Sequence, residues 1–294
     1  MQNFPKISII TPSYNQEQFL EQTMLSVLGQ NYPNLEYIII DGGSTDNSVE
    51  IIKRYENKLA YWISEKDEGQ ASAINKGFER ATGDIFCWLN SDDMFMPGTF
   101  SYIANQLDIM QTMLLTGSSI RYWETAEGLK TSSHTIVKDR EELSLNDVDY
   151  IMQPSTFWTK KTWGEVGKLN EQLHYTFDWE WFLRAELLKV QIKAVNHTMS
   201  IYRIHDNQKT FTGGDKRALE IISLYNQFSP ENIAIFKKLI LNKGRLNNLI
   251  AKVIKKILKT TNSQMQDVAL LKILFPEFRK IDNSRLRGIY LATI

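Results

Sequence analysis

Hydrophobic and polar positions follow one repeating order over the first third of the chain. Apolar, β-branched runs at 6–11, 35–40, 59–64 and 84–89 are each followed by polar, turn-prone residues, and apolar residues recur at helical spacing between the runs. This order predicts strands that alternate with helices, and therefore a mostly parallel sheet flanked by helices. In such a sheet, ligands bind beyond the carboxyl ends of the strands, where all four polar segments fall.

The pattern changes in the second half of the chain. Residues 100–138 mix one helix with strand-like pieces such as 113–120, and turn residues become frequent, which predicts an α+β half. Aromatic and aliphatic residues predict a helix over 176–189, and 191–204 predicts a closing strand or hairpin. Beyond residue 213 the pattern predicts only helices, near 216–228, 231–259 and 264–274.

The composition is that of a globular protein. The chain has 294 residues, of which 43% are hydrophobic and 23% are charged, so disordered and fibrous classes are excluded. A single cysteine, Cys87, excludes an intrachain disulfide and a cysteine metal cluster, and it favours a reducing compartment. The sequence has no signal-peptide pattern and no run of about 18 apolar residues. We therefore expect a cytoplasmic protein, with the cytoplasmic face of a membrane as its alternative place.

The formal net charge of zero hides an uneven distribution. Residues 215–294 contain 15 Lys and Arg against 6 Asp and Glu, a net charge of +9, and residues 1–214 contain 19 against 28, a net charge of −9. Basic and apolar residues interleaved over 233–259 are typical of a helix that binds an anionic membrane surface. A helix that packs on the acidic body or on a second subunit has the same pattern, so both interpretations stay open.

Two acidic turns follow predicted strands. The sequence Asp-Gly-Gly-Ser-Thr-Asp at 41–46 places carboxylates beside glycines that allow close backbone approach to a ligand, although such turns also occur without one. The sequence Asn-Ser-Asp-Asp at 90–93 places two carboxylates side by side after an apolar strand. Their repulsion is relieved by a divalent cation such as Mg²⁺, by ligand hydroxyls, or by solvent if both side chains are exposed.

A charged loop leads into a helix of small residues at 65–77. Small residues let a ligand approach the first turn of the helix, where free N–H groups favour anions. An ordinary helix start with acidic residues in its first turn accounts for the same pattern.

In the order of these motifs, the chain resembles the family 2 glycosyltransferases with the GT-A fold. The matching segments lie at 11–15, 41–46, 67–77, 81–84, 90–93 and 177–184. The resemblance covers about residues 5–210 and implies a GT-A domain over 1–214. This domain would consist of a Rossmann-like nucleotide-binding half, about 1–98, and an α+β acceptor half, about 99–214. The basic helical region 215–294 lies outside the resemblance.

The resemblance implies that a sugar is transferred from a UDP-sugar to an acceptor hydroxyl with inversion. The donor would be a UDP-hexose or UDP-N-acetylhexosamine, and the acceptor a carbohydrate or lipid-linked oligosaccharide in surface polysaccharide assembly, with no nucleic acid as partner. The residues that it implies for the nucleotide-sugar are Thr11, Pro12, Tyr14, Asn15, Asp41, Ser44, Gln70, Asn75 and Asp92.

The same resemblance implies a Mn²⁺ or Mg²⁺ ion held by Asp93, with His205 as a second ligand. Asn90 departs from the common form of the family's Asp-x-Asp element, because many members carry Asp there. Arg203 is an alternative contact for the diphosphate, and a lone His such as His205 is also often structural.

Asp178 matches the family's catalytic aspartate, which would act as the general base, and Glu180 is the alternative. Phe177 stands where many members carry Glu. The segment 153–158 matches the strand that precedes the acceptor helix, and its polar start would line the acceptor site unless the strand is simply buried. The rival functions are a nucleotidyltransferase and a non-catalytic nucleotide-sugar or carbohydrate binding module.

Overall fold

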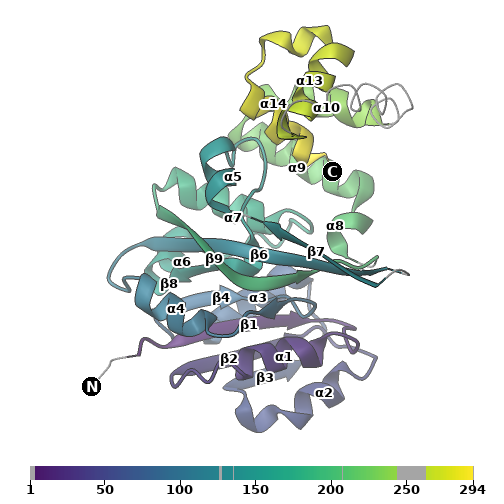
Figure 1. Ribbon diagram of the computed structural model, residues 1–294. Helices are drawn as coiled ribbons and strands as arrows, with labels where there is room; N and C mark the ends of the chain where they lie inside the picture. The colour runs from purple at the N-terminus through teal and green to yellow at the C-terminus, as the bar shows by residue number, and fades with distance from the viewer. Residues whose placement is uncertain (1–3, 126–127, 135, 207, 244–262, 294) are drawn as a thin grey trace. The chain divides into compact units, whose positions relative to one another are not determined.

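The computed structural model describes residues 4–125, 128–134, 136–206, 208–243 and 263–293. The chain divides into two compact units (Figure 1). Unit 1 comprises 1–138 and 151–213, and unit 2 comprises 139–150 and 214–294. This division differs from the predicted domains in one segment, because 139–150 was expected in the acceptor half and instead groups with the C-terminal helices.

Unit 1 contains one sheet with the strand order β3-β2-β1-β4-β8-β6-β9-β5, and β7 pairs with β6. The first four strands along the chain are β1 (Ile7–Ser13), β2 (Leu35–Asp41), β3 (Tyr61–Ser64) and β4 (Ile85–Trp88). They are all parallel, since β1 pairs with β2 and β4, and β2 pairs with β3. The predicted parallel arrangement is thereby confirmed for this half of the sheet.

The other strands pair antiparallel, except that β6 and β9 are parallel to each other. They are β5 (Met94–Phe95), β6 (Met113–Thr125), β7 (Gly128–His134), β8 (Thr156–Thr159) and β9 (Gln191–Arg203). β8 joins the two parts of the sheet because it pairs with both β4 and β6, and the long strands β6 and β9 lie side by side (Figure 1). The strand expected at 153–158 begins as a 3-10 turn, η2 (Gln153–Ser155), and becomes β8 only from Thr156.

Helices cover both faces of this sheet. The elements that follow the strands are α1 (Leu20–Leu28), α2 (Ser48–Arg54), α3 (Gln70–Arg80), α4 (Thr99–Gln106), α6 (Lys160–Val166) and α7 (Phe177–Leu187). Ile9 of β1 belongs to the apolar cluster that includes side chains of α1, α2 and α4. Ile10 points to the opposite face and meets α3, where a Cβ on Gly77 would lie 2.3 Å from Cγ2 of Ile10. Residue 77 must therefore be glycine for α3 to pack this closely.

Aromatic side chains anchor α7 on the same face as α3. The Phe78 ring lies 5.1 Å from Phe86 of β4 and 5.8 Å from Trp158 of β8, and Trp158 lies 4.9 Å from Trp181 of α7. Trp181 Nε1 also donates to the Gly167 carbonyl at 2.8 Å. These buried contacts fix the start of α7 relative to the sheet.

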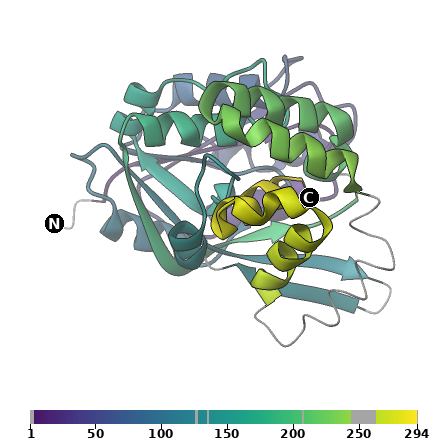
Figure 2. The ribbon, with the colours of Figure 1, turned by 90° about the horizontal axis from the view of Figure 1, so that it is seen from above.

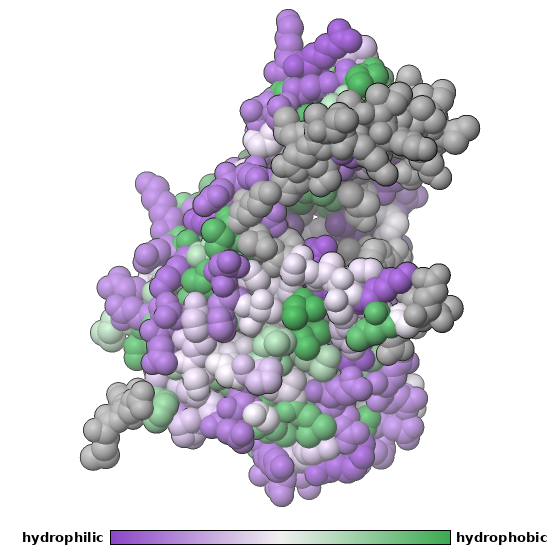
Figure 3. Space-filling view, in the orientation of Figure 1, coloured by the Kyte–Doolittle hydropathy of each residue, from purple (hydrophilic) through white to green (hydrophobic). Residues whose placement is uncertain are grey.

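On the face of unit 1 that Figure 3 presents, hydrophobic surface is confined to small separated patches.

Unit 2 is helical, as predicted for the region after 213. It contains α9 (Gly214–Phe228), α10 (Ile233–Leu241), α13 (Ser263–Leu274) and α14 (Asn283–Ala292). α10 contacts α9 and α14, and α14 contacts α13, so the four helices pack as one group (Figure 2). The rest of the long helix expected over 231–259 lies outside the described residues beyond 243. In the described part of the chain, no helix has the length and apolar character needed to span a membrane.

Polar contacts tie the segment 139–150 to these helices. Asn232 Nδ2 donates to Asp147 Oδ1 at 2.8 Å, and Arg287 pairs with Glu142 at 2.6 Å. The shorter elements of the chain are α5 (Ile136–Glu142), α8 (Lys209–Thr212), η1 (Glu56–Lys58), η3 (Pro230–Asn232) and η5 (Pro276–Lys280).

Candidate active site

The polar segments that the sequence singled out meet at one edge of the sheet. The register places Ser13 opposite Asp41 and Asp41 opposite Ser64, so the carboxyl ends of β1, β2 and β3 are level. β4 ends beside β1, with Trp88 opposite Ile10. The loops that follow these parallel strands therefore lie together, as expected for a ligand site of an α/β sheet.

Asp41 is fully buried at this edge and holds its own turn together. Its Oδ2 accepts hydrogen bonds from the Gly43 and Ser44 N–H groups at 3.1 and 2.9 Å and from Ser64 Oγ at 2.6 Å. Its Oδ1 accepts from Ser44 Oγ at 2.6 Å. Asp41 and Ser44, two of the residues predicted to bind the nucleotide-sugar, thus stabilise the turn after β2. The carboxylate of Asp41 is hydrogen-bonded to protein groups.

The predicted residues after β1 divide into buried and exposed ones. Thr11 and Pro12 are buried within β1, and Thr11 Oγ1 lies 3.1 Å from Tyr37 Oη. Tyr14 is 61% exposed, and Asn15 is exposed with a φ of 51°. Asn15 joins two loops, because its Oδ1 accepts from Thr45 N at 2.8 Å and its N–H donates to Ser44 Oγ at 2.8 Å. Tyr14 and Asn15 are therefore the members of this group that a ligand can reach directly.

Two side chains beside this group were not selected from the sequence. Ser13 Oγ, at the end of β1, is buried and has no hydrogen-bond partner among the described residues. Asp67 lies against the Gly42 backbone, where a Cβ would be 2.9 Å from its Oδ2. Burial, opposed by a hydrogen bond from the Gly69 N–H group, raises the pKa of Asp67. The acidic loop 65–69 was recognised in the sequence, but its approach to residue 42 depends on the fold.

Gln70 and Asn75 lie on the same helix but have different surroundings. Gln70, the first residue of α3, donates from Nε2 to Asn90 Oδ1 at 2.7 Å. Asn75 is 2% exposed, and its amide bonds both backbone groups of Leu169 at 3.0 Å and Glu171 Oε1 at 2.8 Å. The structure thus brings Gln70 to the turn after β4, whereas the amide of Asn75 is buried and is used by the loop before α7.

The two aspartates of the turn after β4 differ in exposure. The Asp92 side chain is 21% exposed, and its Oδ2 lies 3.1 Å from His205 Nε2. Asp93 is 1% exposed and accepts the Arg203 N–H at Oδ1 at 3.1 Å, whereas Oδ2 has no hydrogen-bond partner within the described residues. Burial and the neighbouring Asp92 carboxylate hold the pKa of Asp93 well above its usual range. His205, which was predicted with Asp93 as a ligand of the metal, thus contacts the Asp92 side chain in the structure.

These side chains fit a divalent cation in chemistry, although the described residues contain no ready cluster of three ligands. Asp92 and His205 supply a carboxylate and an imidazole that are both partly exposed. Mg²⁺ and Mn²⁺ are commonly held by one or two carboxylates together with phosphate oxygens of a substrate. The unbonded Oδ2 of Asp93 is a further acceptor in the same turn, but it is buried.

Arg203 supports this turn from within. It is 8% exposed, its Nε donates to the Asp92 carbonyl at 3.0 Å, and its guanidinium also bonds Gln22. The guanidinium lies over the Phe19 and Tyr122 rings, at 4.5 and 5.2 Å from their centroids. Of the two diphosphate contacts considered from the sequence, Arg203 thus holds the backbone of the turn, and His205 faces the Asp92 side chain.

The start of α7 carries the two candidate bases in different states. Glu180 is buried, and both of its oxygens are bound by Arg184, at 2.8 and 3.0 Å. Arg184 also bonds the carbonyls of Val166 and Lys168. Asp178 is half-buried, and its Oδ1 accepts from the Trp179 N–H at 2.8 Å. The geometry therefore makes Glu180 part of an internal ion pair and leaves Asp178 as the more accessible carboxylate.

One cation near these groups was missed in the sequence. Lys209 Nζ donates to Gln70 Oε1 at 3.1 Å and lies 5.4 Å from the centroid of the Phe177 ring. Lys209 lies four residues after His205 in the sequence, but only Arg203 and His205 were predicted as site residues in this part of the chain. Its contact with α3 joins residues far apart in the sequence, so no local pattern indicates it.

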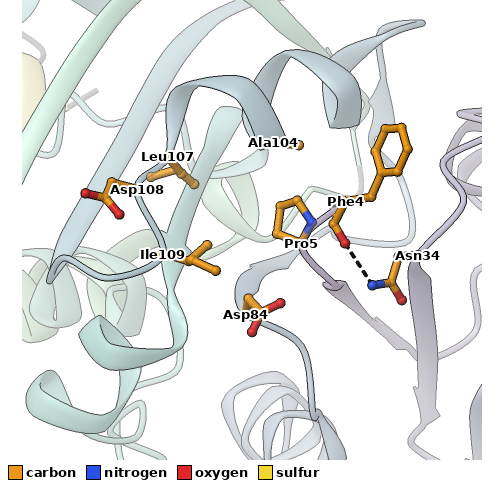
Figure 4. A pocket seen from close by; sticks show the side chains of 8 residues that line it. All are labelled: Phe4, Pro5, Asn34, Asp84, Ala104, Leu107, Asp108 and Ile109. Carbon is orange, nitrogen blue, oxygen red and sulfur yellow. Dashed lines mark hydrogen bonds between the residues drawn. The ribbon is translucent and has the colours of Figure 1, made fainter. Parts of the chain in front are cut away.

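A cavity of about 300 Å³ lies at the opposite edge of the sheet (Figure 4). Its carboxylates are Asp84 and Asp108, which accept backbone N–H groups of Lys6 and Met110 at 2.8 and 3.0 Å. Asn34 donates to the Phe4 carbonyl at 3.0 Å. These polar groups serve local backbone structure, and the cavity contains none of the predicted site residues.

Known glycosyltransferases are similar to this chain in sequence. An uncharacterized glycosyltransferase of Rickettsia typhi is 29% identical over 229 residues, which cover 71% of this chain and 67% of that protein. TuaG of Bacillus subtilis, which is named for teichuronic acid biosynthesis, is 42% identical over 92 residues. The match to TuaG covers 30% of this chain and 36% of that protein.

Solved structures share the fold over nearly the whole chain. S. aureus TarS 1-349, solved with UDP-GlcNAc, has a TM-score of 0.58 at 17% identity, and the match covers 98% of this chain and 90% of TarS 1-349. The mannosyltransferase PcManGT of Pyrobaculum calidifontis, solved with GDP-Man and Mn²⁺, has a TM-score of 0.59 at 14% identity. The match covers 99% of this chain and 86% of PcManGT. These matches confirm the predicted GT-A fold. The model of glycosyl transferase family 2 matches residues 8–167, more than half of the chain, and the chain therefore belongs to this family.

Proposed function

We propose that this chain transfers a hexosyl or N-acetylhexosaminyl group from a UDP-sugar to an acceptor hydroxyl with inversion. The observation that carries this proposal is the contrast between the candidate side chains. Asp92 with His205, and Asp178, are partly accessible, whereas Asp41 and Glu180 are saturated by protein contacts. The partly exposed carboxylates are the ones that a metal-bound diphosphate and a reacting hydroxyl can approach from solvent.

The donor nucleoside is proposed to bind over the turns after β1, β2 and β3. Tyr14 and Asn15 are exposed there, Ser13 Oγ is a buried hydroxyl at the same strand end, and Asp67 lies against Gly42. Asp41 and Ser44 hold the shape of the second turn. A uridine nucleotide is favoured because TarS, which has the same fold, was solved with UDP-GlcNAc.

Asp92 and His205 are proposed to hold Mn²⁺ or Mg²⁺ at the donor diphosphate. When bound, the ion offsets the negative charge that grows on the leaving diphosphate. Asp92 takes this role in preference to Asp93 because its side chain is partly exposed and already faces His205. Asp93, which is buried and bonded to the Arg203 backbone, holds the turn in place. PcManGT, which has the same fold, was solved with Mn²⁺, and this supports a metal cofactor.

Asp178 is proposed as the general base. It takes the proton of the acceptor hydroxyl while the oxygen of that hydroxyl forms a bond to the anomeric carbon. The bond from this carbon to the diphosphate oxygen breaks, and its electron pair leaves with the diphosphate. Attack from the side opposite the leaving group inverts the anomeric carbon. Glu180 is unsuited to this role because Arg184 engages both of its oxygens.

The acceptor is proposed to be a carbohydrate or a lipid-linked oligosaccharide in surface polysaccharide assembly at the cytoplasmic face of a membrane. The similarity to TuaG supports this pathway. In unit 2, Lys237 and Leu241 are exposed on α10, and Leu241 is 84% exposed. A basic helix with an exposed apolar residue suits an anionic membrane surface, where a lipid-linked acceptor would be located.

The test is release of UDP from a panel of UDP-sugars, with Mn²⁺ and with EDTA, first without acceptor. Metal-dependent release from one sugar would support the proposed reaction and identify the donor. Binding of UDP without release, also when carbohydrate acceptors are added, would indicate a binding module. Formation of pyrophosphate from UTP and a sugar 1-phosphate would indicate a nucleotidyltransferase, and either result would contradict the proposal.

A further inference from the structure

We propose that Thr23 of α1 is a positioning residue for the metal site, because its hydroxyl holds the turn that carries Asp92. This inference rests on the proposed function, in which Asp92 is a ligand of the ion. Thr23 is fully buried, and its Oγ1 donates to the Ser91 carbonyl at 2.9 Å and to the Asp93 carbonyl at 2.7 Å. One hydroxyl group thus bonds the residues on both sides of Asp92.

These contacts differ from the usual ones of a threonine inside a helix. Such a hydroxyl commonly donates to a carbonyl three or four residues earlier in its own helix. The hydroxyl of Thr23 instead bonds residues that are 68 and 70 positions later in the sequence. Ser91 and Asp93 are both buried, so without this hydroxyl their carbonyls would lose a donor in a place that water does not reach. The hydroxyl therefore serves the turn and not the helix.

Arg203 holds the carbonyl that lies between these two. Its Nε donates to the Asp92 carbonyl at 3.0 Å, and its backbone N–H donates to Asp93 Oδ1 at 3.1 Å. The three consecutive carbonyls of residues 91–93 thus accept hydrogen bonds from two buried side chains, one on α1 and one on β9. Because the backbone is held on both sides of Asp92, its carboxylate moves mainly through its own side-chain torsions. A ligand held in this way loses little conformational freedom when it binds an ion.

Thr23 is the first of three polar residues in a line along α1. Ser26 is three residues later, and Gln30, just beyond the C-terminal end of the helix, is four residues after that, so the spacing places them on one face. The backbone groups that Ser26 and Gln30 bond are the Phe95 N–H at 3.1 Å and the Met96 carbonyl at 3.0 Å. The line therefore holds the backbone of 91–96 from one end to the other, and its Thr23 end is beside the proposed metal ligand.

The experiment uses the two ends of this line as variant and control. Thr23→Val keeps the shape of the side chain and removes the hydroxyl, whereas Thr23→Ser keeps the hydroxyl. Gln30→Met removes the hydrogen bond to the Met96 carbonyl at the far end and is the matched control. Calorimetry with UDP, in Mn²⁺ and in EDTA, gives the effect of the metal on affinity, and thermal unfolding gives the stability of each variant. If Thr23→Val does not fold, Thr23→Ala takes its place, because its comparison with Thr23→Ser also isolates the hydroxyl.

We expect Thr23→Val to reduce the increase in UDP affinity that Mn²⁺ causes by about tenfold, because the metal ligand is no longer held in place. In EDTA, its UDP affinity should stay within about twofold of the unmodified chain. Thr23→Ser should retain most of the Mn²⁺ effect. Thr23→Val and Gln30→Met should both lower the midpoint of thermal unfolding by about 2 to 4 °C, the effect of a lost hydrogen bond, but Gln30→Met should keep the full Mn²⁺ effect.

Three results would contradict the inference. An unchanged Mn²⁺ effect in Thr23→Val, in a chain whose UDP binding depends on Mn²⁺, would overturn it and leave the proposed function standing. An equal loss of the Mn²⁺ effect in Gln30→Met would also overturn it, since the cause would then be a general loss of stability. Absent or metal-independent UDP binding by the unmodified chain would overturn the proposed metal site and this inference together.

Discussion

Two acidic turns follow buried parallel strands of the same sheet, and their carboxylates are in opposite states. In the turn after β2, Asp41 is fully buried and accepts hydrogen bonds from its own turn and from Ser64. In the turn after β4, Asp92 is partly exposed beside His205, and Asp93 has a buried oxygen without a partner in the described structure. In the first turn, protein groups supply the hydrogen bonds of the carboxylate. In the second turn, carboxylate oxygens remain that a ligand could bind.

This difference separates two roles that look alike in the sequence. A carboxylate saturated by protein donors stabilises the fold, and its removal should reduce the free energy of unfolding. A carboxylate that is only partly satisfied contributes less to folding and more to binding or catalysis. The predictions below test this separation, from the largest expected effect to the smallest.

The largest effect should come from α7, where the same contrast occurs within one helix. Asp178→Asn should reduce turnover by a factor of about 10² or more, because the base is lost, while donor affinity stays nearly unchanged. Glu180→Gln should reduce the free energy of unfolding by about 2 kcal/mol, because it disrupts the pair with Arg184. Steady-state kinetics and denaturant unfolding measure the two effects. Full turnover in Asp178→Asn would remove Asp178 from the mechanism.

The next effect should be on the metal dependence of donor binding. Asp92→Asn should lower the Mn²⁺-dependent affinity for UDP by about tenfold or more, since a ligand of the ion is lost. Calorimetry with Mn²⁺ and with EDTA measures this, and Asp108→Asn at the opposite edge of the sheet is the control. If Asp93→Asn abolishes the increase in UDP affinity that Mn²⁺ causes and Asp92→Asn does not, Asp93 is the metal ligand and Asp92 is not.

A smaller effect should be seen on stability at the other turn. Asp41→Asn replaces an oxygen that accepts from Ser44 and Ser64 by an amide, so we expect a loss of about 1.5 kcal/mol in the free energy of unfolding. Urea denaturation measures the loss, with Asp92→Asn as the comparison that should change stability little. Unchanged stability together with weaker UDP binding would show that Asp41 contacts the donor directly.

The smallest effect concerns pH and another saturated carboxylate, Glu36 of β2. Burial alone would raise its pKa, but hydrogen bonds from Lys6, Ser8 and Thr82 lower it to about 2, from 4.5. Since the pKa in the folded state is the lower one, the stabilisation is fully present above about pH 4.5 and is lost as the pH falls toward 2.

Thermal unfolding at several pH values between 7 and 3 measures this dependence. The stability difference between the unmodified chain and Glu36→Gln should shrink as the pH falls, whereas the exposed Glu56→Gln should behave like the unmodified chain throughout. A difference that stays constant with pH would show that the charge of Glu36 does not contribute to folding.

The sequence predicted the parallel half of the sheet because its signals are local. Each buried strand is a short apolar run, and each turn that follows carries Gly, Ser or Asp. The position of the site followed from the same order, since the carboxyl ends of parallel strands share one edge. Asp92 and Asp178 could be proposed on these grounds together with the resemblance to the family.

The hydrogen-bond and ion-pair partners of each site side chain could not be predicted in the same way. Asp92 meets His205, and Asn75 meets Leu169, only through contacts between residues about 100 positions apart. The saturation of Glu180 had a signal in the sequence, because Arg184 is four residues later on the same helix face. This spacing distinguishes Glu180 from Asp178, which has Phe182 four residues later.

The grouping of residues 139–150 with the C-terminal helices has a consequence for folding during synthesis, because this segment is made before the helices that it packs with. Asp147 is held by Asn232, and the side chain of Val148 packs beside Gly288, yet a ribosome releases this segment long before those partners exist. Unit 1 is complete in sequence at residue 213, whereas the segment 139–150, which belongs to unit 2, still lacks its partners at that point. A stop codon after residue 213 would therefore produce a chain with an exposed apolar segment, and its signature in the cell would be aggregation before any loss of catalytic groups.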